Sequence, residues 1–340
     1  MVHAPGPTAE VRLTVLVTGG AGYIGSHMVK LLQERGRRVV VLDNLSTGHR
    51  DAVKGIEFVE GNVGDAGKVT ALLEEHAVET VIHFAAYSLV AESVADPVKY
   101  RSNNIDATLR MLSAMREARV GRIVFSSTAA VYGEPRESPI DESHPTQPIN
   151  PYGAGKLVIE RALDDLHAAQ GLHSASLRYF NAAGADPGGG LGERHNPETH
   201  LIPLVLQAAS GRRASVAVFG TDYPTRDGTC VRDYVHVNDL CDAHLLALEW
   251  LEDGGGRAAF NLGSENGATV MEVIEAARRE TRAPINVRVE GRRPGDPAVL
   301  VASCEQARRV LGWSPKRSNL ATIVQDAWRW ERSRAAHPGA

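Results

Sequence analysis

The sequence has 340 residues, of which 43% are hydrophobic and 23% are charged, and its formal net charge is −4. These values are ordinary for a globular protein with a sizeable core, and the length suggests about two domains. No basic stretch is long enough to follow a phosphate backbone, so nucleic acid is not an expected partner. The longest apolar runs have the length of strands, which excludes a membrane span.

The N-terminal end and the cysteines bear on the cellular compartment. Residues 1–11, "MVHAPGPTAEV", contain neither the charged nor the apolar region of a signal peptide, and we expect a flexible tail. Cys230, Cys241 and Cys304 have no metal-ligand spacing and cannot all pair with one another. We therefore expect no metal site, no disulfide framework and a cytoplasmic location.

Short apolar runs alternate with longer helix-like segments through the first half of the chain. The run "LTVLVTGG" is followed by a helical pattern over residues 25–36 and by a second run, "RRVVVLDN". The same unit recurs over residues 71–86, 108–128 and 156–181. This alternation predicts βαβ units and a parallel sheet buried on both faces. Right-handed crossovers make a doubly wound α/β fold of the Rossmann type the expected class.

The rhythm ends after Asn181, where residues 182–200 are polar and rich in glycine and proline. We therefore expect a first domain over residues 12–181 and a smaller α/β substrate-binding domain over residues 182–340. A strand and a helix near residues 231–260 could return to the first domain.

A glycine-rich turn marks the expected cofactor site. "LVTGGAGYIGSH" places Gly19, Gly22 and Gly25 at three-residue spacing between a strand and a helix. These glycines permit a tight turn, close approach of a pyrophosphate and close helix packing, and a helix N-terminus attracts the anion. The spacing also occurs in plain turns, but Asp43 ends the next strand, where a carboxylate can hold the ribose hydroxyls. A carboxylate would repel a 2′-phosphate, so residues 12–181 are expected to bind NAD rather than NADP.

A tyrosine and a lysine share the face of another helix. Asn150 is a good N-cap and Pro151 suits the first helical position. Tyr152 and Lys156 are then neighbours at i and i+4. A phenol with a pKa of about 10 needs roughly 4 kcal/mol to ionise at pH 7, which one cation at about 4 Å would supply. A bound NAD⁺ nicotinamide would add a second positive charge. Tyr-x-x-x-Lys also arises by chance, but here it predicts a general base next to a hydride acceptor.

Three hydroxyls end a further strand, "RIVFSST". Ser126, Ser127 and Thr128 would face the ligand crevice at the carboxyl edge of the sheet. One of them could bridge the tyrosine and a substrate oxygen, while ordinary turn chemistry accounts for the others.

These blocks, in this order, resemble the extended short-chain dehydrogenase/reductase family, and within it the nucleotide-sugar epimerases, over nearly the whole chain. The most specific block is "GTDYPTRDGTCVRDYVHVNDL", accompanied by "LDNLSTG", "LRYFNAAGA" and "RRPGDPA". The resemblance implies tightly bound NAD, a UDP-sugar substrate, a homodimer and reversible C4 epimerisation of a UDP-hexose through a 4-keto intermediate.

The resemblance also implies individual roles. Tyr152 would be the base, Lys156 its partner and Thr128 the strand-end hydroxyl. The further cofactor contacts would be Tyr23, Ile24, Asp43, Asn44, Leu45, Ser46, Thr47, Gly48, Asn62, Val63, Phe84, Ala85, Ala86, Ser88, Asn103 and Phe180. The substrate contacts would be Asn181, His200, Leu201, Val218, Phe219, Arg232, Tyr234, Arg293, Asp296 and Leu300, with arginine suited to a diphosphate.

Several positions depart from the best-known members of the family. Ser88 replaces a lysine that contacts the cofactor, Asn62 an aspartate near the adenine, and His200 an asparagine near UDP. Thr128 replaces a serine, and Leu300 stands where some members carry a tyrosine, so N-acetylated sugars could enter.

Three alternatives remain open at this point. A UDP-N-acetylhexosamine or UDP-pentose 4-epimerase would use the same residues. A nucleotide-sugar dehydratase would need an acid pair where this chain has Ala129 and Ala130. A non-catalytic NAD-binding module would be expected to have lost Tyr152 or Lys156.

Overall fold

The computed structural model describes residues 13–293 and 295–336, so the expected tail at residues 1–11 lies outside the described residues. Its centre is a seven-stranded sheet in which every pairing is parallel. In spatial order the strands are β11 (Arg257–Leu262), β6 (His173–Tyr179), β5 (Arg122–Thr128), β4 (Val78–His83), β1 (Thr14–Thr18), β2 (Arg38–Asp43) and β3 (Glu57–Glu60). The chain turns back between β1 and β4, which is where ligands bind in such sheets.

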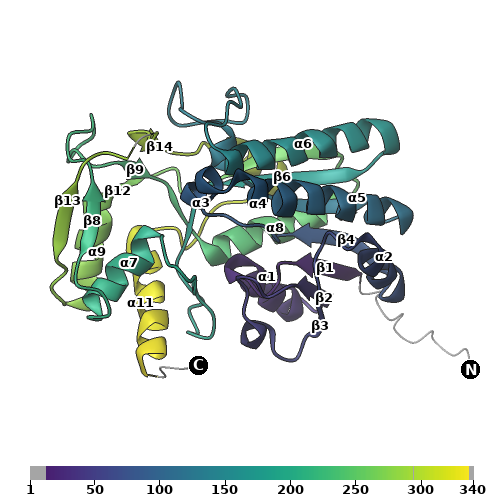
Figure 1. Cartoon of the computed structure of the whole chain (residues 1–340), viewed down its shortest axis with the longest axis horizontal. Helices are drawn as coiled ribbons and strands as arrows, with labels where there is room; N and C mark the ends of the chain where they lie inside the picture. The colour runs from purple at the N-terminus through teal and green to yellow at the C-terminus, as the bar shows by residue number, and fades with distance from the viewer. Residues whose placement is uncertain (1–12, 294, 337–340) are drawn as a thin grey trace, which may run out of the picture.

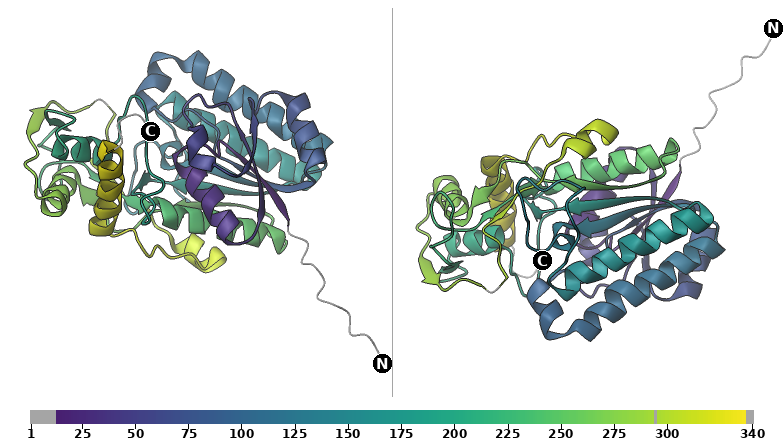
Figure 2. Two further views of the ribbon diagram at one scale, coloured as in Figure 1. Left: turned by 90° about the horizontal axis from the view of Figure 1, so that it is seen from below. Right: turned by 90° about the horizontal axis from the view of Figure 1, so that it is seen from above.

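Helices cover both faces of this sheet (Figures 1 and 2). One face carries α1 (Tyr23–Glu34) and α8 (Val237–Glu252), and the other carries α2 (Ala66–Glu75), α5 (Ala107–Glu117) and α6 (Pro151–Gln170). Neighbouring strand residues point to opposite faces. Val15 and Val17 accordingly join the core under α1 and α8, and Leu16 joins the core under α2, α5 and α6. The predicted doubly wound parallel sheet is confirmed.

The last strand of the central sheet comes from late in the chain. β11 pairs with β6, and α8 precedes it and packs against α1. Helix α10 (Glu305–Leu311) contacts both α8 and β11. Residues 237–262 are therefore structurally part of the large sheet layer.

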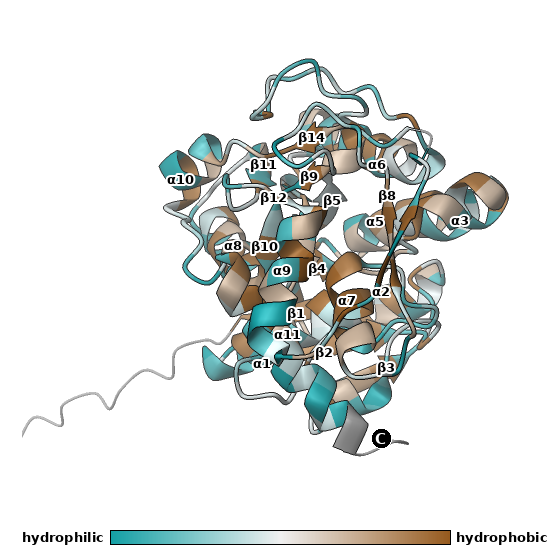
Figure 3. Cartoon of the chain, turned by 90° about the vertical axis from the view of Figure 1, so that its left-hand side faces the viewer, coloured by the Kyte–Doolittle hydropathy of each residue, from teal (hydrophilic) through white to brown (hydrophobic). Residues whose placement is uncertain are grey.

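The remaining C-terminal elements form a smaller body beyond the carboxyl ends of the central strands (Figure 1). Its core is built from α7 (Leu201–Ala209), α9 (Val270–Thr281) and α11 (Leu320–Ala336), which pack on one another. In Figure 3 α7 is brown, while much of α11 is teal, as expected for a buried helix beside an amphipathic one. Its short strands are β7 (Asn181–Ala183), β8 (Val216–Phe219), β9 (Val231–Arg232), β10 (Tyr234–His236), β12 (Ala268–Thr269), β13 (Val287–Glu290) and β14 (Val299–Leu300).

Short helical segments complete the described chain. They are η1 (Arg50–Val53), α3 (Val90–Ala95), α4 (Pro97–Tyr100), the π-helical η2 (Arg101–Asp106) and η3 (Ala129–Val131). Within residues 13–293 and 295–336, none of the helices combines the length and the hydropathy that crossing a membrane requires.

The glycine-rich turn is fixed by close packing of backbone on backbone. Gly19 has φ +69°, and a Cβ there would lie 2.5 Å from the nitrogen of Ala85. A Cβ on Gly25 would lie 2.2 Å from the carbonyl oxygen of Gly19. Neither position has room for a side chain, so the turn brings α1 directly against the ends of β1 and β4.

We predict that Gly25→Ala destabilises the protein by roughly 1–3 kcal/mol or more, because backbone would have to move to admit the methyl group. Urea denaturation of the purified variant measures this loss. Gly121→Ala is the matched control, since a Cβ there meets nothing within 4 Å. Equal stability of the two variants would contradict the role of close packing at Gly25.

Candidate active site

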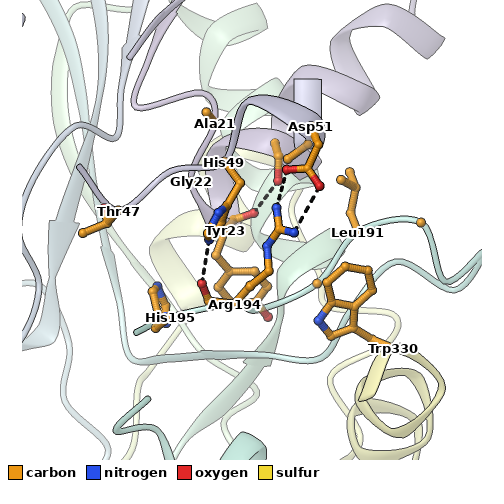
Figure 4. Close-up of a pocket in the computed structure, with 14 residues that line it drawn as sticks. Ala21, Gly22, Tyr23, Thr47, His49, Asp51, Leu191, Arg194, His195 and Trp330 are labelled. Carbon is orange, nitrogen blue, oxygen red and sulfur yellow. Dashed lines mark hydrogen bonds and ion pairs between the residues drawn. The ribbon is translucent and has the colours of Figure 1, made fainter. Parts of the chain in front are cut away.

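The glycine-rich turn presents an open helix N-terminus. Gly22 precedes α1 with extended backbone and no side-chain cap, and the first turn has no acidic residue. Free N–H groups and the helix dipole therefore favour an anion here. A cavity of about 50 Å³ opens beside the turn, lined by Gly22, Tyr23, Thr47, His49 and others (Figure 4). The Tyr23 hydroxyl donates to the carbonyl of Gly184 at 2.7 Å and ties the turn to the smaller body.

Asp43 stands at the end of β2, as expected, and is held by backbone. Its two oxygens accept from the N–H groups of Ala21 (2.9 Å) and Leu45 (2.8 Å). Burial raises the pKa of Asp43, and these hydrogen bonds oppose that rise. A carboxylate oxygen can accept more than one hydrogen bond, so the held carboxylate can still receive ribose hydroxyls.

The other predicted cofactor residues lie in loops at the carboxyl ends of the strands or next to them. Asn44, Ser46, Thr47 and Gly48 follow β2; Asn62 and Val63 follow β3; Phe84, Ala85, Ala86 and Ser88 follow β4. Asn62 Oδ1 accepts from Gly64 N–H at 2.7 Å. Ile24, Val63, Phe84 and Phe180 pack against hydrophobic core, and Asn103 Nδ2 donates to Asn104 Oδ1 at 2.9 Å.

Asn104 was missed by the sequence analysis. Its side chain accepts from Tyr87 N–H at 2.9 Å and donates to the Tyr87 carbonyl at 2.8 Å, which fixes the loop after β4. An asparagine in a helix carries no distinguishing sequence signal, so only the tertiary structure identifies this contact.

Helix α6 begins as predicted and places Tyr152 at the end of β5. The Asn150 side chain accepts from Gly153 N–H at 2.8 Å, and Pro151 is the first helical residue. The Tyr152 N–H donates to Ser93 Oγ at 3.3 Å. Thr128 ends β5 next to the phenol: burial raises the pKa of Tyr152, and the nearby Thr128 side chain lowers it by a smaller amount. The predicted hydroxyl and phenol are therefore adjacent.

The two serines before Thr128 are engaged elsewhere. Ser126 Oγ forms a hydrogen bond with the Tyr179 hydroxyl, and Ser127 Oγ donates to Glu160 Oε1 at 2.5 Å. Of the three strand-end hydroxyls, Thr128 is thus the one directed to Tyr152.

The surroundings of Lys156 affect how Tyr152 can ionise. Its Nζ donates to the Ser126 carbonyl at 2.7 Å and lies 5.9 Å from the Tyr152 ring centroid. Burial raises the pKa of Tyr152 to about 12, above its ordinary value, because the effect of burial exceeds that of the Thr128 hydrogen bond. Burial also lowers the pKa of Lys156 to about 7, opposed by the nearby Glu160 carboxylate. Because both groups are desolvated, Lys156 alone does not bring the phenol to neutrality, and the second positive charge expected from bound NAD⁺ is needed as well.

An ion pair that the sequence analysis missed lies beneath this lysine. Arg178 Nη2 lies 2.6 Å from Glu160 Oε2, and both side chains are buried. Arg178 also donates to the Tyr132 hydroxyl at 3.0 Å, and that hydroxyl donates to Asn261 Oδ1 at 2.7 Å. The arginine in "LRYFN" was a usable signal, since a charged residue in a buried strand must have a partner.

The predicted substrate residues form two groups in the smaller body. Arg232 Nη2 lies 2.7 Å from Asp296 Oδ1, and Arg232 pairs in register with Leu300. Arg293 stacks on Phe219 with 3.7 Å between the guanidinium carbon and the ring centroid. These residues gather near one another from β9, β14, β8 and the loop before β14.

Other predicted substrate residues are less accessible. Val218 and Tyr234 are buried in the core of the smaller body, where Leu201 also packs. Any contact of Val218 with a ligand would therefore use its backbone. Tyr234 pairs in register with Asn181.

His200 belongs to a charged cluster with Glu193, His195 and Glu198. Its Nδ1 lies 2.6 Å from Glu193 Oε1. Burial lowers the pKa of His200, but the Glu193 carboxylate raises it more, to about 10. The sequence analysis named His200 only as a substrate contact that replaces an asparagine. It missed Glu193, His195 and Glu198.

Comparisons with known proteins agree with this geometry. Residues 15–263 match the model of the NAD dependent epimerase/dehydratase family. The chain belongs to that family.

This epimerase/dehydratase family member is 52% identical over 326 residues to a UDP-glucose 4-epimerase of Halalkalibacterium halodurans, covering 96% of this chain and 97% of that protein. A solved UDP-glucose 4-epimerase from Brucella ovis, in complex with NAD, is 48% identical with a TM-score of 0.91 and covers 93% of this chain and 97% of its own. A solved UDP-glucose 4-epimerase from Bifidobacterium longum, in complex with NAD+ and UDP, is 38% identical and has a TM-score of 0.90. The match covers 96% of this chain and 99% of that chain. The resemblance seen in the sequence is confirmed.

We predict that Arg178→Met destabilises this family member by about 3–5 kcal/mol, because it leaves the Glu160 charge buried without a partner. Urea denaturation measures the loss. The double variant Glu160→Met/Arg178→Met should recover most of it. Arg288→Met, which breaks an exposed pair with Glu290, serves as the control and should cost about 0–1 kcal/mol. A single-variant loss no larger than this control would contradict the role given to the buried pair.

Proposed function

We propose that the protein interconverts UDP-galactose and UDP-glucose by reversible epimerisation at C4, through a transient 4-keto sugar and with NAD remaining bound. The observation that carries the proposal is the meeting of Tyr152 and Thr128 at the carboxyl end of β5, on the same edge of the sheet as the glycine-rich turn. The relatives named UDP-glucose 4-epimerase favour a hexose substrate over the alternatives.

The residues at the turn fit NAD. An uncapped helix N-terminus suits a pyrophosphate, and the Asp43 carboxylate suits an adenosine ribose without a 2′-phosphate. Residues expected to hold the cofactor are those of the turn, the loops after β2, β3 and β4, and Tyr152, Lys156 and Phe180. When bound, NAD⁺ supplies a hydride acceptor, and its reduced form supplies the donor for the return step.

Tyr152 moves the proton in this mechanism. Its oxygen takes the proton from the sugar 4-hydroxyl and later returns it to the 4-keto oxygen. The Thr128 hydroxyl, hydrogen-bonded to Tyr152, is in position to bridge the phenol and the sugar oxygen. Lys156 lies on the same helix as Tyr152, and its Nζ donates to the Ser126 carbonyl of β5. In this position its ammonium form favours the phenolate.

Arg232, Arg293 and Asp296 would hold the nucleotide end of the substrate. Arginine side chains can make paired, charge-assisted hydrogen bonds to a diphosphate. Arg232 is anchored by Asp296 and by the Pro297 carbonyl (2.8 Å), which limits its movement. Anchoring at the nucleotide leaves the sugar free to present either face of C4.

The rival functions lack support at specific positions. A dehydratase needs acid groups after the strand-end hydroxyl, and Ala129 and Ala130 stand there, in η3. A non-catalytic NAD-binding module would not need Thr128, Tyr152 and Lys156 together. UDP-N-acetylhexosamines and UDP-pentoses remain candidate additional substrates.

The organisation of the chain follows from this function. We propose that residues 12–181 bind NAD and residues 182–340 bind the nucleotide sugar, with residues 231–260 contributing to the first part through α8 and β11. We also propose a cytoplasmic homodimer without a nucleic-acid partner. The exposed valines Val90, Val94 and Val98 and the exposed Leu109 and Val158, on α3 to α6, support pairing through this side.

We predict that Tyr152→Phe lowers turnover of UDP-galactose by roughly 10²–10⁴-fold, because the proton acceptor is lost. NAD content and UDP affinity should stay near normal, since the phenol ring remains. A coupled assay for UDP-glucose measures turnover, and cofactor extraction measures NAD.

Tyr223→Phe is the matched control, because it also removes a buried tyrosine hydroxyl, one that lies next to Cys230 rather than at the end of β5. It should keep normal turnover. A Tyr152→Phe enzyme as fast as this control would refute the base assignment.

We predict that the wild-type protein also turns over UDP-N-acetylglucosamine and that Leu300→Tyr lowers this activity at least severalfold more than activity on UDP-glucose. Leu300 is half-buried and packs against the cluster that contains Ala129 and Val131, next to Thr128, so a larger ring would narrow the sugar space. Product assays on UDP-glucose, UDP-galactose, their N-acetyl forms and UDP-xylose test this. No turnover of N-acetylated sugars by the wild type would count against it.

A further inference from the structure

The segment between β7 and α7 brings four metal-ligating side chains together. Glu193, His195, Glu198 and His200 each offer one ligand atom, and these atoms all lie within 4.8 Å of one another. Across residues 13–293 and 295–336 this is the one such group of three or more histidine, cysteine, aspartate or glutamate side chains. None of the chemistry proposed above uses Glu193, His195 or Glu198.

The geometry is close to that of a tetrahedral metal site. His200 Nδ1 lies 2.6 Å from Glu193 Oε1 and 3.2 Å from Glu198 Oε1. His195 Nδ1 lies 3.0 Å from Glu193 Oε1 and 3.8 Å from Glu198 Oε2. Bonds of about 2.0–2.2 Å to a tetrahedral zinc ion place neighbouring ligand atoms roughly 3.4 Å apart. The observed separations bracket that value, so small side-chain rotations would complete the coordination.

Burial and charge also suit a cation. The Glu193 and Glu198 side chains are only 6% and 7% exposed, while His200 is 40% exposed and leaves a route from solvent. The neighbouring Arg194 is paired with Asp51, and Arg212 with Glu331 (Figure 4 shows the Arg194 pair). Among the described residues, the ion pairs of Glu193 and Glu198 are those with the two histidines.

Surrounding contacts hold the ligands in place, as outer contacts do at metal sites. Trp330 Nε1 on α11 donates to the Glu193 carbonyl at 2.9 Å. The His195 ring lies edge-on to Tyr23, with 6.3 Å between ring centroids. Glu198 Oε1 accepts from Thr199 N–H at 2.8 Å. The cluster is therefore braced by α1 and α11 as well as by its own loop.

We propose that Glu193, His195, Glu198 and His200 bind one divalent transition-metal ion, with Zn²⁺ as the occupant. Two imidazoles and two carboxylates are a donor set that suits zinc. The ion would fasten the loop of residues 182–200 to Tyr23 at the glycine-rich turn and to α11. Its role is structural, because all four protein ligands are used and no open position is left for a reactant.

The full-length protein, stripped with a chelator and dialysed, is titrated with Co²⁺ while visible absorbance is recorded, and Zn²⁺ is then added in competition. We expect a tetrahedral Co²⁺ spectrum that saturates at one ion per chain and disappears with Zn²⁺. Zinc should also raise the melting temperature. Metal content by elemental analysis gives the stoichiometry.

His195→Ala and Glu198→Gln should each weaken Co²⁺ and Zn²⁺ binding by roughly tenfold or more. His76→Ala, at the C-cap of α2 and outside the cluster, is the matched control and should bind as the wild type does. Circular dichroism shows whether each variant is folded. We expect His195→Ala to remain folded, because the His195 side chain is partly exposed. Absence of saturable binding in the wild type, or equal affinity in His195→Ala and His76→Ala, would overturn the proposal. These readouts do not involve epimerase activity, so the two proposals fail separately.

Discussion

The hydrogen bond from Lys156 Nζ to the Ser126 carbonyl (2.7 Å) joins α6 to the end of β5. Tyr152 stands one turn earlier on that helix, and Thr128 stands two residues further along that strand. Together with the packing of α6 on the sheet, this contact fixes where the phenol lies relative to the hydroxyl. Beneath it, Glu160 binds Arg178 and Ser127, so a buried network reaches from the same helix into β5 and β6. This buried polar layer lies directly beneath Tyr152 and Thr128.

Burial sets how the site can ionise. With the pKa of Tyr152 at about 12 in the free protein, forming the phenolate at neutral pH costs roughly 7 kcal/mol. One cation at about 4 Å in an effective dielectric near 20 supplies about 4 kcal/mol. Lys156 cannot close this gap alone, especially since burial lowers its own pKa to about 7. A second positive charge near the phenol is needed, and an oxidised nicotinamide carries one. The base role proposed for Tyr152 therefore depends on the bound cofactor.

The features that could be predicted from the sequence are those determined locally. The strand and helix pattern, the cap at Asn150 and the glycine-rich turn depend on neighbouring residues, and the structure contains all of them. Spacing on a helix also placed Tyr152 and Lys156 on one face. Spacing alone could not show that Lys156 turns toward the Ser126 carbonyl, because that carbonyl comes from β5.

The features that the sequence did not indicate depend on contacts between distant elements. Glu160 and Arg178 are eighteen positions apart on a helix and a strand, and their pairing follows from how α6 crosses β6. The cluster around Glu193 lies in one short segment, yet its shape depends on Trp330 and Tyr23, which come from opposite ends of the chain. A polar segment rich in glycine and proline reads as an irregular linker. In the folded protein it connects the glycine-rich turn to the start of α7, so its rigidity affects how the large sheet layer and the smaller body are held together.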